Sequence, residues 1–187
     1  MAPRPENPGD DFPYQAPDDS KLNSVFIPLF LSSDDELSVL LTLRSRNMAH
    51  GGQISFPGGQ IEKGETARSA AIRETCEEIH CQKKDILIAG KLSSLYLHRT
   101  NNLIEPFAGK LDTQPDLTIS NREVEEIIPV PVCDLLEEKN MVREKWILRD
   151  GAVFDVPFWG IHEVPLWGAT AMILSELLHL YGEFKNG

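Results

Sequence analysis

The sequence predicts an α/β fold in which helices cover the faces of one mixed β-sheet. Two segments, 66–79 and 169–181, have helix composition, and the second carries an apolar stripe at helical spacing. Around them lie short apolar runs that end at Pro, Gly or Asp residues, which is typical of strands separated by turns. The chain has 187 residues, the size of one ordinary domain. We therefore expect a single layered domain over residues 21–187.

The first predicted element is a β-hairpin that follows an extended arm. Residues 1–20 hold five prolines and five acidic residues, and such a segment buries too little apolar surface to fold, so we expect a poorly ordered arm. The apolar runs 25–31 and 37–43 flank an acidic turn at 33–36 and predict a hairpin. Pro28 within the first run favours an edge position or a bulge.

Beyond the hairpin the chain mixes helical and strand-like segments. A glycine-rich loop at 51–59 leads into the helix 66–79, which contains neither Gly nor Pro. Apolar runs bounded by turn residues predict the further strands, at 86–97, 103–111, 124–130, 141–148 and 152–159. The last two runs form a hairpin around Asp150-Gly151. A short helix is expected at 132–139, and the helix 169–181 closes the chain.

The charge balance restricts the kinds of partner. Lys and Arg total 18 against 29 Asp and Glu, which gives a net charge of −11. Nucleic-acid-binding proteins need a basic face for phosphates, and anionic membranes attract basic segments, so we expect neither partner. An anionic small molecule is compatible with this charge, because a bound divalent metal reverses the local field.

Cysteine usage and hydropathy together predict a cytoplasmic protein. The three cysteines, Cys76, Cys81 and Cys133, lack metal-binding spacing, and a sparse odd number suits free thiols in a reducing compartment. No segment approaches the roughly 18 apolar residues of a membrane helix. The first residues resemble neither a secretion signal nor a transit peptide.

Three carboxylates share one face of the predicted helix 66–79. At about 100° per residue, Glu74, Glu77 and Glu78 lie on that face. The opposite side carries an apolar stripe that should anchor the helix to the core, formed by Ile72, Cys76 and Ile79. Crowded like charges destabilise a helix by a few tenths of a kcal/mol per pair, and a hard divalent cation such as Mg²⁺ would offset this. Taken alone, the same pattern also fits a solvated acidic surface.

The spacing of these residues resembles the Nudix box, G-x5-E-x7-R-E-U-x-E-E-x-G-U, where U is aliphatic. Its fixed positions are occupied by Gly59, Glu65, Arg73, Glu74, Glu77 and Glu78, and agreement at so many fixed positions rarely arises by chance. The chain departs from the box at Thr75, where an aliphatic residue is expected, and at His80, where the final Gly is expected. His reaches the left-handed conformation that follows a helix end, at some energetic cost.

The resemblance implies an α/β/α sandwich and a hydrolase that cleaves a nucleoside diphosphate linked to another group. The ligands that it implies for Mg²⁺ or Mn²⁺ are the carboxylates of Glu74, Glu77 and Glu78 and the carbonyl of Gly58. Arg73 would orient the carboxylates, and Glu65 would fix the loop against the helix. A carboxylate must accept the proton of the attacking water, and Glu74 or a residue of the segment 123–126, such as Glu123, is the candidate base.

Segments on both sides of the box resemble the coenzyme A pyrophosphatase subfamily. They span 40–45, 52–59, 104–109, 121–125 and 166–171. The resemblance implies cleavage of coenzyme A to 3′,5′-ADP and 4′-phosphopantetheine, with Arg44, Arg46 and Gly59 at the substrate. Met48 stands where the subfamily has a loop arginine. Arg46 could replace that arginine and bind the 3′-phosphate, or its loss could widen the choice of substrate.

Three functions therefore stay open. The chain is a diphosphatase for coenzyme A or a derivative, a pyrophosphatase for ADP-ribose or nucleotide sugars, or a Nudix domain that binds a nucleotide without catalysis. The intact carboxylate face argues against the third, because a binding domain has no need for three crowded anions. The resemblance is also compatible with a homodimer.

Overall fold

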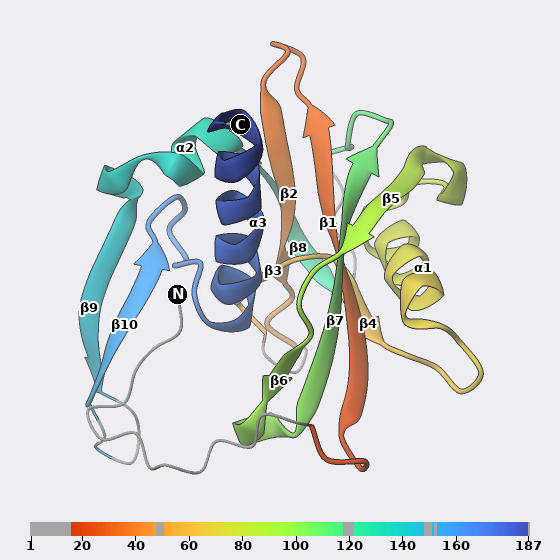
Figure 1. Ribbon diagram of the computed structural model, residues 1–187, viewed down its shortest axis with the longest axis horizontal. Coiled ribbons are helices and arrows are strands. Elements are labelled where there is room, and N and C mark those ends of the chain that lie inside the picture. Colours follow the sequence, from red (N-terminus) through yellow and green to blue (C-terminus); the bar gives the residue numbers. More distant parts are fainter. Residues whose placement is uncertain (1–15, 48–50, 118–121, 148–150, 152, 187) are drawn as a thin grey trace.

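A mixed eight-stranded sheet with helices on both faces dominates the structure, a computed structural model that describes residues 16–47, 51–117, 122–147, 151 and 153–186. The strands of this sheet are β1 (Lys21–Leu31), β2 (Leu37–Arg44), β3 (Ile54–Ser55), β4 (Gly58–Gln60), β5 (Ile86–Lys91), β6 (Leu95–Leu97), β7 (Asn102–Leu111) and β8 (Val124–Pro131). The central order is β3-β2-β1-β7-β5, with β4 beside β1, β6 beside β7 and β8 beside β2. Strands β9 (Met141–Ile147) and β10 (Val153–Trp159) form a separate antiparallel hairpin (Figure 1).

The helices are α1 (Ala67–Ile79), α2 (Val132–Leu136) and α3 (Gly168–Asn186). Short 3₁₀ turns lie at η1 (Lys83–Asp85), η2 (His98–Thr100) and η3 (Glu138–Asn140). The helix expected at 132–139 is therefore shorter, because its second half forms η3, and α3 is longer than the expected 169–181. None of the described helices is long and apolar enough to cross a membrane.

Alternating side chains of the central strands build two cores, one on each face of the sheet. Phe26 and Leu40 pack in a cluster that includes α1 residues, whereas Ile27 and Leu41 pack in a cluster that includes α3 residues. Neighbouring strand residues point to opposite faces, so α1 and α3 cover opposite faces of the sheet. Strands β1 and β7 run parallel while their other pairings are antiparallel. The expected α/β/α sandwich with a mixed sheet is confirmed.

The predicted hairpin of 25–31 and 37–43 is confirmed as β1 and β2 (Figure 1), but Pro28 is not at an edge. Strand β1 lies inside the sheet, and Pro28 is paired in register with Gly109 of β7. On the other side of β1, the described pairing with β4 ends at Val25 and that with β2 begins at Leu29. The N–H of Phe26 points to that side, toward Pro57. Pro28 lies two residues after Phe26, so the N–H that it lacks would point to the same side of β1. That position falls in the gap between the β4 pairing and the β2 pairing, where no hydrogen bond of the described ladder is lost.

Two further strand predictions need correction. The run 86–97 is divided into β5 and β6, with a register shift in the β5–β7 pairing between Ile88 and Gly90. The strand 124–130 was expected to stop at Pro129 and Pro131, and β8 does end at Pro131, but it continues through Pro129, which is paired with Leu40. Strand β8 pairs only with β2 among the described strands, and an edge strand tolerates proline because its free side needs no N–H donor.

The N-terminal segment is described only from residue 16. Residues 16–20 form a turn held to Asn101, which accepts a hydrogen bond from the Ser20 hydroxyl at 3.1 Å. The rest of the expected arm, 1–15, lies outside the described residues, as do Met48 and Asp150 of the predicted loop and turn.

Candidate active site

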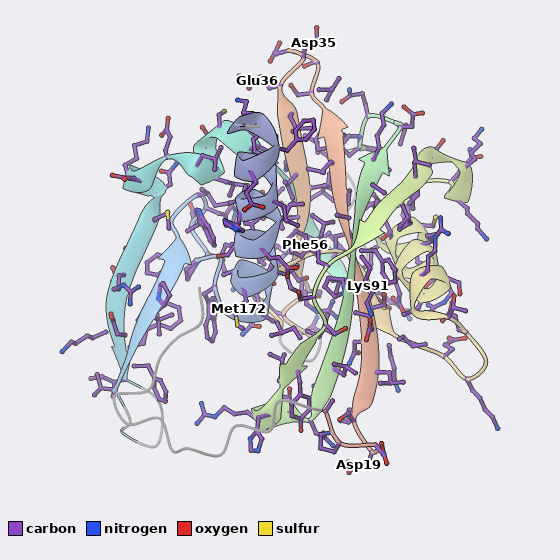
Figure 2. All side chains as sticks on the ribbon, in the orientation of Figure 1. Asp19, Asp35, Glu36, Phe56, Lys91 and Met172 are labelled. Atoms are coloured by element: carbon purple, nitrogen blue, oxygen red, sulfur yellow. The ribbon has the colours of Figure 1, made fainter. Side chains whose placement is uncertain are left out.

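The glycine-rich segment lies between strands β1 and β2 as the two short strands β3 and β4. Strand β3 pairs with β2 and strand β4 pairs with β1, and the Phe56 side chain between them is buried in the core that faces α3 (Figure 2). A Cβ on Gly58 would lie 2.3 Å from the Ser24 carbonyl oxygen, so only glycine brings the backbone this close to β1. This close approach places Gly58 and Gly59 beside helix α1.

Helix α1 begins and ends where the sequence predicts. Thr66 caps its N-terminus by accepting a hydrogen bond from the Ser69 N–H. His80 ends it in the left-handed conformation with φ 52°, which confirms the conformation expected at this position. The predicted apolar stripe faces the core, because Ile79 is buried and Ile72 and Cys76 pack against it. The buried side of α1 is wider than predicted, since it also includes Ala70, Ala71, Thr75 and Glu78. The small residues let the helix approach the sheet closely, and Glu78 is thereby turned inward.

Carboxylates from two distant segments converge beside this helix. Glu74, Glu78 and Glu123 each offer one oxygen, and these atoms lie within 4.8 Å of one another. Glu123 arrives through strand pairing, because β8 runs along β2 with Val124 opposite Arg44. The backbone N–H of Ser45 donates to the Glu123 carbonyl at 2.8 Å and closes this pairing.

Glu78 is an almost fully buried carboxylate. Its side chain is 2% exposed, and its Oε2 accepts a hydrogen bond from the Gly58 N–H at 3.2 Å. Its Oε1 lies 3.5 Å from the Arg44 guanidinium. Burial raises the pKa of Glu78 to about 7, although Arg44 and the Gly58 N–H act in the opposite direction. A carboxylate held in this environment favours either a proton or an additional cation.

Glu74 is oriented by a glycine and an arginine. A Cβ on Gly59 would lie 2.5 Å from the Glu74 carboxyl carbon, so the absent side chain leaves the space that this carboxylate fills. Arg73 donates to Glu74 Oε1 at 2.8 Å. Burial raises the pKa of Glu74, and Arg73 limits that rise.

The Arg73 guanidinium also ties the box loop to the helix. It donates to both Glu65 oxygens, at 3.1 and 3.0 Å, and to the Gln60 carbonyl at 3.2 Å. The hydrogen bond from Arg73 lowers the pKa of Glu65, and the same contact raises that of Arg73. Both groups are charged at neutral pH, and their two-point contact fixes the direction of the Arg73 side chain.

The remaining predicted site residues lie outside the cluster of three carboxylates. Glu77 is 62% exposed and its nearest described cation is Arg73 at 3.5 Å. Arg46 is 81% exposed and lies 3.9 Å from Glu125. Arg44, expected at the substrate, contacts Glu78, and its substrate role stays a prediction. The metal role of Glu77 and the substrate role of Arg46 stay predictions.

The donor set fits a hard divalent cation. Glu74, Glu78 and Glu123 supply only carboxylate oxygens, the ligands that Mg²⁺ and Mn²⁺ prefer. Burial disfavours the ionised form of Glu78, and an added cation beside it would stabilise that form. Sequence reasoning named Glu123 only as a base and missed its place beside Glu74 and Glu78, which depends on the β2–β8 pairing.

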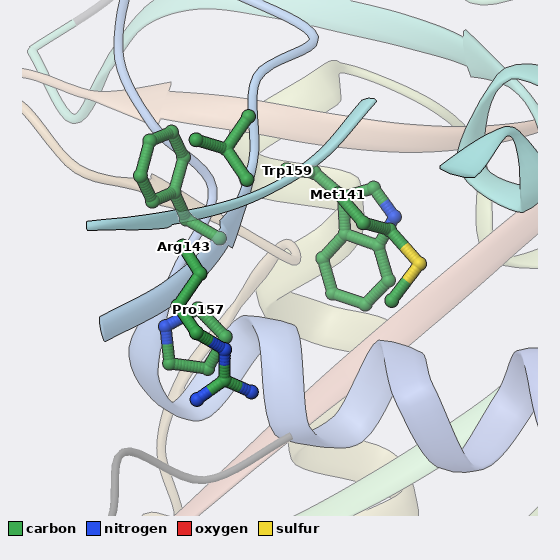
Figure 3. Close-up of a pocket in the computed structure, with 6 residues that line it drawn as sticks. Met141, Arg143, Pro157 and Trp159 are labelled. Atoms are coloured by element: carbon green, nitrogen blue, oxygen red, sulfur yellow. The ribbon is translucent and has the colours of Figure 1, made fainter. Parts of the chain in front are cut away.

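A cavity adjoins the cluster. Its volume is about 290 Å³, and its lining residues are Glu77, Glu78, His80, Arg122 and Glu123. A second pocket of about 50 Å³ lies in the β9–β10 hairpin, where Met141, Arg143, Pro157 and Trp159 are among its lining residues (Figure 3). This second pocket is too small for a substrate, since small-molecule sites span about 300–1,000 Å³.

Comparison with known proteins assigns the family. The NUDIX domain model matches residues 21–149. The peroxisomal coenzyme A diphosphatase ndx-8 of Caenorhabditis elegans is 36% identical over 168 residues, covering 87% of this chain and 70% of that protein. The mitochondrial coenzyme A diphosphatase NUDT8 of Homo sapiens is 30% identical over 150 residues, covering 76% of this chain and 62% of that protein.

A solved structure supports the same fold. The mutT/nudix family protein from Listeria innocua has a TM-score of 0.56 at 20% identity, covering 92% of this chain and 100% of that chain. Taken with the NUDIX match over 21–149, these similarities show that the chain belongs to the NUDIX family and is a Nudix hydrolase.

Proposed function

We propose that this chain is a divalent-metal-dependent diphosphatase that cleaves coenzyme A, or a derivative, into 3′,5′-ADP and 4′-phosphopantetheine. Nudix hydrolases act on small-molecule diphosphates and generally need divalent metal ions. The observation that carries the proposal is the convergence of Glu74, Glu78 and Glu123 beside a cavity of about 290 Å³. The coenzyme A substrate is supported by the two relatives with that name and by the flanking segments 40–45 and 52–59.

The proposed ion is Mg²⁺ or Mn²⁺, held by Glu74, Glu78 and Glu123. When bound, such an ion neutralises diphosphate oxygens and acidifies a water molecule. The protein's contribution is orientation. The Gly58 N–H and Arg44 hold Glu78 in place.

Glu123 is the stronger candidate for the general base. Its side chain is exposed, so a proton taken from water can pass on to solvent. Glu74 is 14% exposed and its Oε1 already accepts a hydrogen bond from Arg73, so this carboxylate is less accessible to a water molecule. We expect Glu123→Gln to lower kcat by about a hundredfold or more. Mn²⁺ binding measured by electron paramagnetic resonance should weaken less than in Glu74→Gln, and the reverse order would make Glu74 the base.

A substrate panel tests the proposed activity. Coenzyme A, dephospho-coenzyme A, ADP-ribose and a nucleotide sugar are incubated with Mg²⁺ or Mn²⁺, and the products are identified by mass. We expect coenzyme A to have the highest kcat/KM and to yield 3′,5′-ADP. Met48 at the subfamily's arginine position favours the alternative, an ADP-ribose or nucleotide-sugar pyrophosphatase. Brisk cleavage of those compounds without cleavage of coenzyme A would support that alternative, and binding without cleavage of any compound would indicate a non-catalytic domain.

We propose that Arg46 binds the 3′-phosphate of coenzyme A. Each charge-assisted contact contributes about 1.5–3 kcal/mol, so dephospho-coenzyme A should be about tenfold to a hundredfold poorer in kcat/KM. Arg46→Ala should remove most of this preference. Equal kcat/KM values for both substrates in the wild type would show that no residue recognises the 3′-phosphate.

The cellular compartment and the oligomeric state of the protein are also proposals. We place the protein in the cytoplasm on its cysteine usage, although the two named relatives are peroxisomal and mitochondrial forms. Imaging of a tagged chain in its own cell tests this. A homodimer would appear in light scattering as twice the chain mass of 21.0 kDa.

A further inference from the structure

The cavity beside the carboxylate cluster has walls of opposite charge. Glu78 and Glu123 belong both to the cluster and to the cavity lining, whereas Glu74 does not line the cavity. The cavity therefore extends from the cluster toward the C-terminal end of α1, where His80 and Arg122 complete the lining. Its volume of about 290 Å³ is close to the lower end of the range for small-molecule sites, about 300–1,000 Å³.

Among the described residues, Arg122 differs from the other arginines near the site because its side chain has no partner there. Arg44 lies against Glu78, and Arg73 binds Glu65 and Glu74. The Arg122 side chain is exposed and has neither a hydrogen bond nor an ion pair within the described part of the chain. In a protein with a net charge of −11, carboxylates are abundant, so an unpaired guanidinium on the cavity wall is free to bind an anion.

We propose that Arg122 binds the diphosphate of the substrate from the cavity side of the carboxylate cluster. This inference rests on the proposed function and deepens it by naming a residue that contacts the substrate. The planar guanidinium donates paired N–H groups to phosphate oxygens. Such a contact also explains how a site lined by Glu77, Glu78 and Glu123 admits an anionic substrate.

The role of Arg122 differs from that proposed for Arg46. Arg46 is not among the lining residues of the cavity and lies beside Glu125. Arg46 is expected to act only on substrates that carry a 3′-phosphate. Arg122 is expected to act on every diphosphate substrate, since it binds the group that all of them share.

The test compares Arg122→Ala and Arg122→Lys with a matched control, Arg68→Ala. Arg68 is an exposed arginine in the first turn of α1, and about ten residues at 1.5 Å each, or roughly 15 Å, separate it from Glu78 along the helix. We expect Arg122→Ala to lower kcat/KM about tenfold to a hundredfold, by the same factor on coenzyme A and on dephospho-coenzyme A. Arg122→Lys should recover only part of this loss, and Arg68→Ala should behave as the wild type.

A binding measurement separates this proposal from the proposed function. Titration calorimetry with non-hydrolysable imidodiphosphate and Mg²⁺ should give a Kd at least about tenfold higher for Arg122→Ala than for the wild type. Mn²⁺ affinity measured without the ligand should be unchanged. Unchanged imidodiphosphate binding in Arg122→Ala would overturn the assignment. A larger loss on coenzyme A than on dephospho-coenzyme A would also overturn it, because Arg122 would then read the 3′-phosphate. If the wild type cleaves ADP-ribose and not coenzyme A, the proposed substrate fails while the binding result still decides the role of Arg122.

Discussion

In the metal-free protein, stability should fall as the pH rises from about 5 to about 7.5. The pKa of Glu78 is about 7 in the folded chain and 4.5 for an unperturbed glutamate. Between these values the folded chain holds a proton that the unfolded chain has released, so raising the pH favours unfolding. The stability associated with protonated Glu78 is therefore fully present below pH 4.5 and is lost as the pH passes through about 7. Glu74 acts in the same direction, since burial raises its pKa too.

The size of the effect follows from the shift. A rise from 4.5 to about 7, at about 1.4 kcal/mol for each pKa unit, corresponds to an upper limit of roughly 3.5 kcal/mol. For a chain of this length each kcal/mol moves the melting temperature by about 2–4 °C, so the total change is at most roughly 7–14 °C. Thermal unfolding in EDTA between pH 5 and pH 7.5 measures it. Saturating Mg²⁺ should restore stability at the higher pH, because the ion binds the ionised carboxylates of the folded chain.

Two variants isolate Glu78 from the other acidic groups. Glu78→Gln should flatten most of the pH dependence and raise the stability of the metal-free protein above pH 7. Glu36→Gln makes the same change at an exposed position, in the turn between β1 and β2 (Figure 2), and should keep the wild-type slope. The reasoning is refuted if Glu78→Gln and the wild type lose stability in parallel.

Three other substitutions test separate parts of the site. Gly59→Ala should reduce activity at least about tenfold, because the new Cβ would occupy the space of the Glu74 carboxylate. The control Gly90→Ala should keep the wild-type activity, because the space around Gly90 is open. Equal activities of the two variants would refute the packing argument. Arg73→Lys should lower kcat more than about tenfold because an ammonium lacks the two-point geometry, and full activity in a steady-state assay would contradict this. His80→Gly should raise stability by up to about 1 kcal/mol, since Gly adopts a positive φ without a Cβ penalty; a lower melting temperature would show that the imidazole makes a stabilising contact.

Local patterns predicted most of the elements correctly. The hairpin of β1 and β2 and the helix α1 are fixed by nearby residues, because apolar runs, turn residues and a capping threonine act within a few positions. Pro28 and Pro129 were interpreted wrongly for a related reason. Whether a strand lies inside the sheet, and where its ladder is interrupted, depends on partners far along the chain.

The candidate site was predicted in part, for the same physical reason. The helical spacing correctly placed Glu74 and Glu78 near each other and Ile79 in the core, but it did not show that Glu78 is buried as well. Burial of the small residues Ala71 and Thr75 turns Glu78 inward. Glu123 joins the cluster through the long-range pairing of β8 with β2, for which no local pattern gives a signal.

Diffraction from crystals soaked with Mn²⁺ tests the central claim most directly. The anomalous signal of Mn²⁺ locates the ion without reference to activity. We predict one ion about 2 Å from carboxylate oxygens of Glu74, Glu78 and Glu123, and its loss from crystals of Glu78→Gln. An ion bound elsewhere, or one that Glu77 holds without Glu123, would contradict the proposed metal centre.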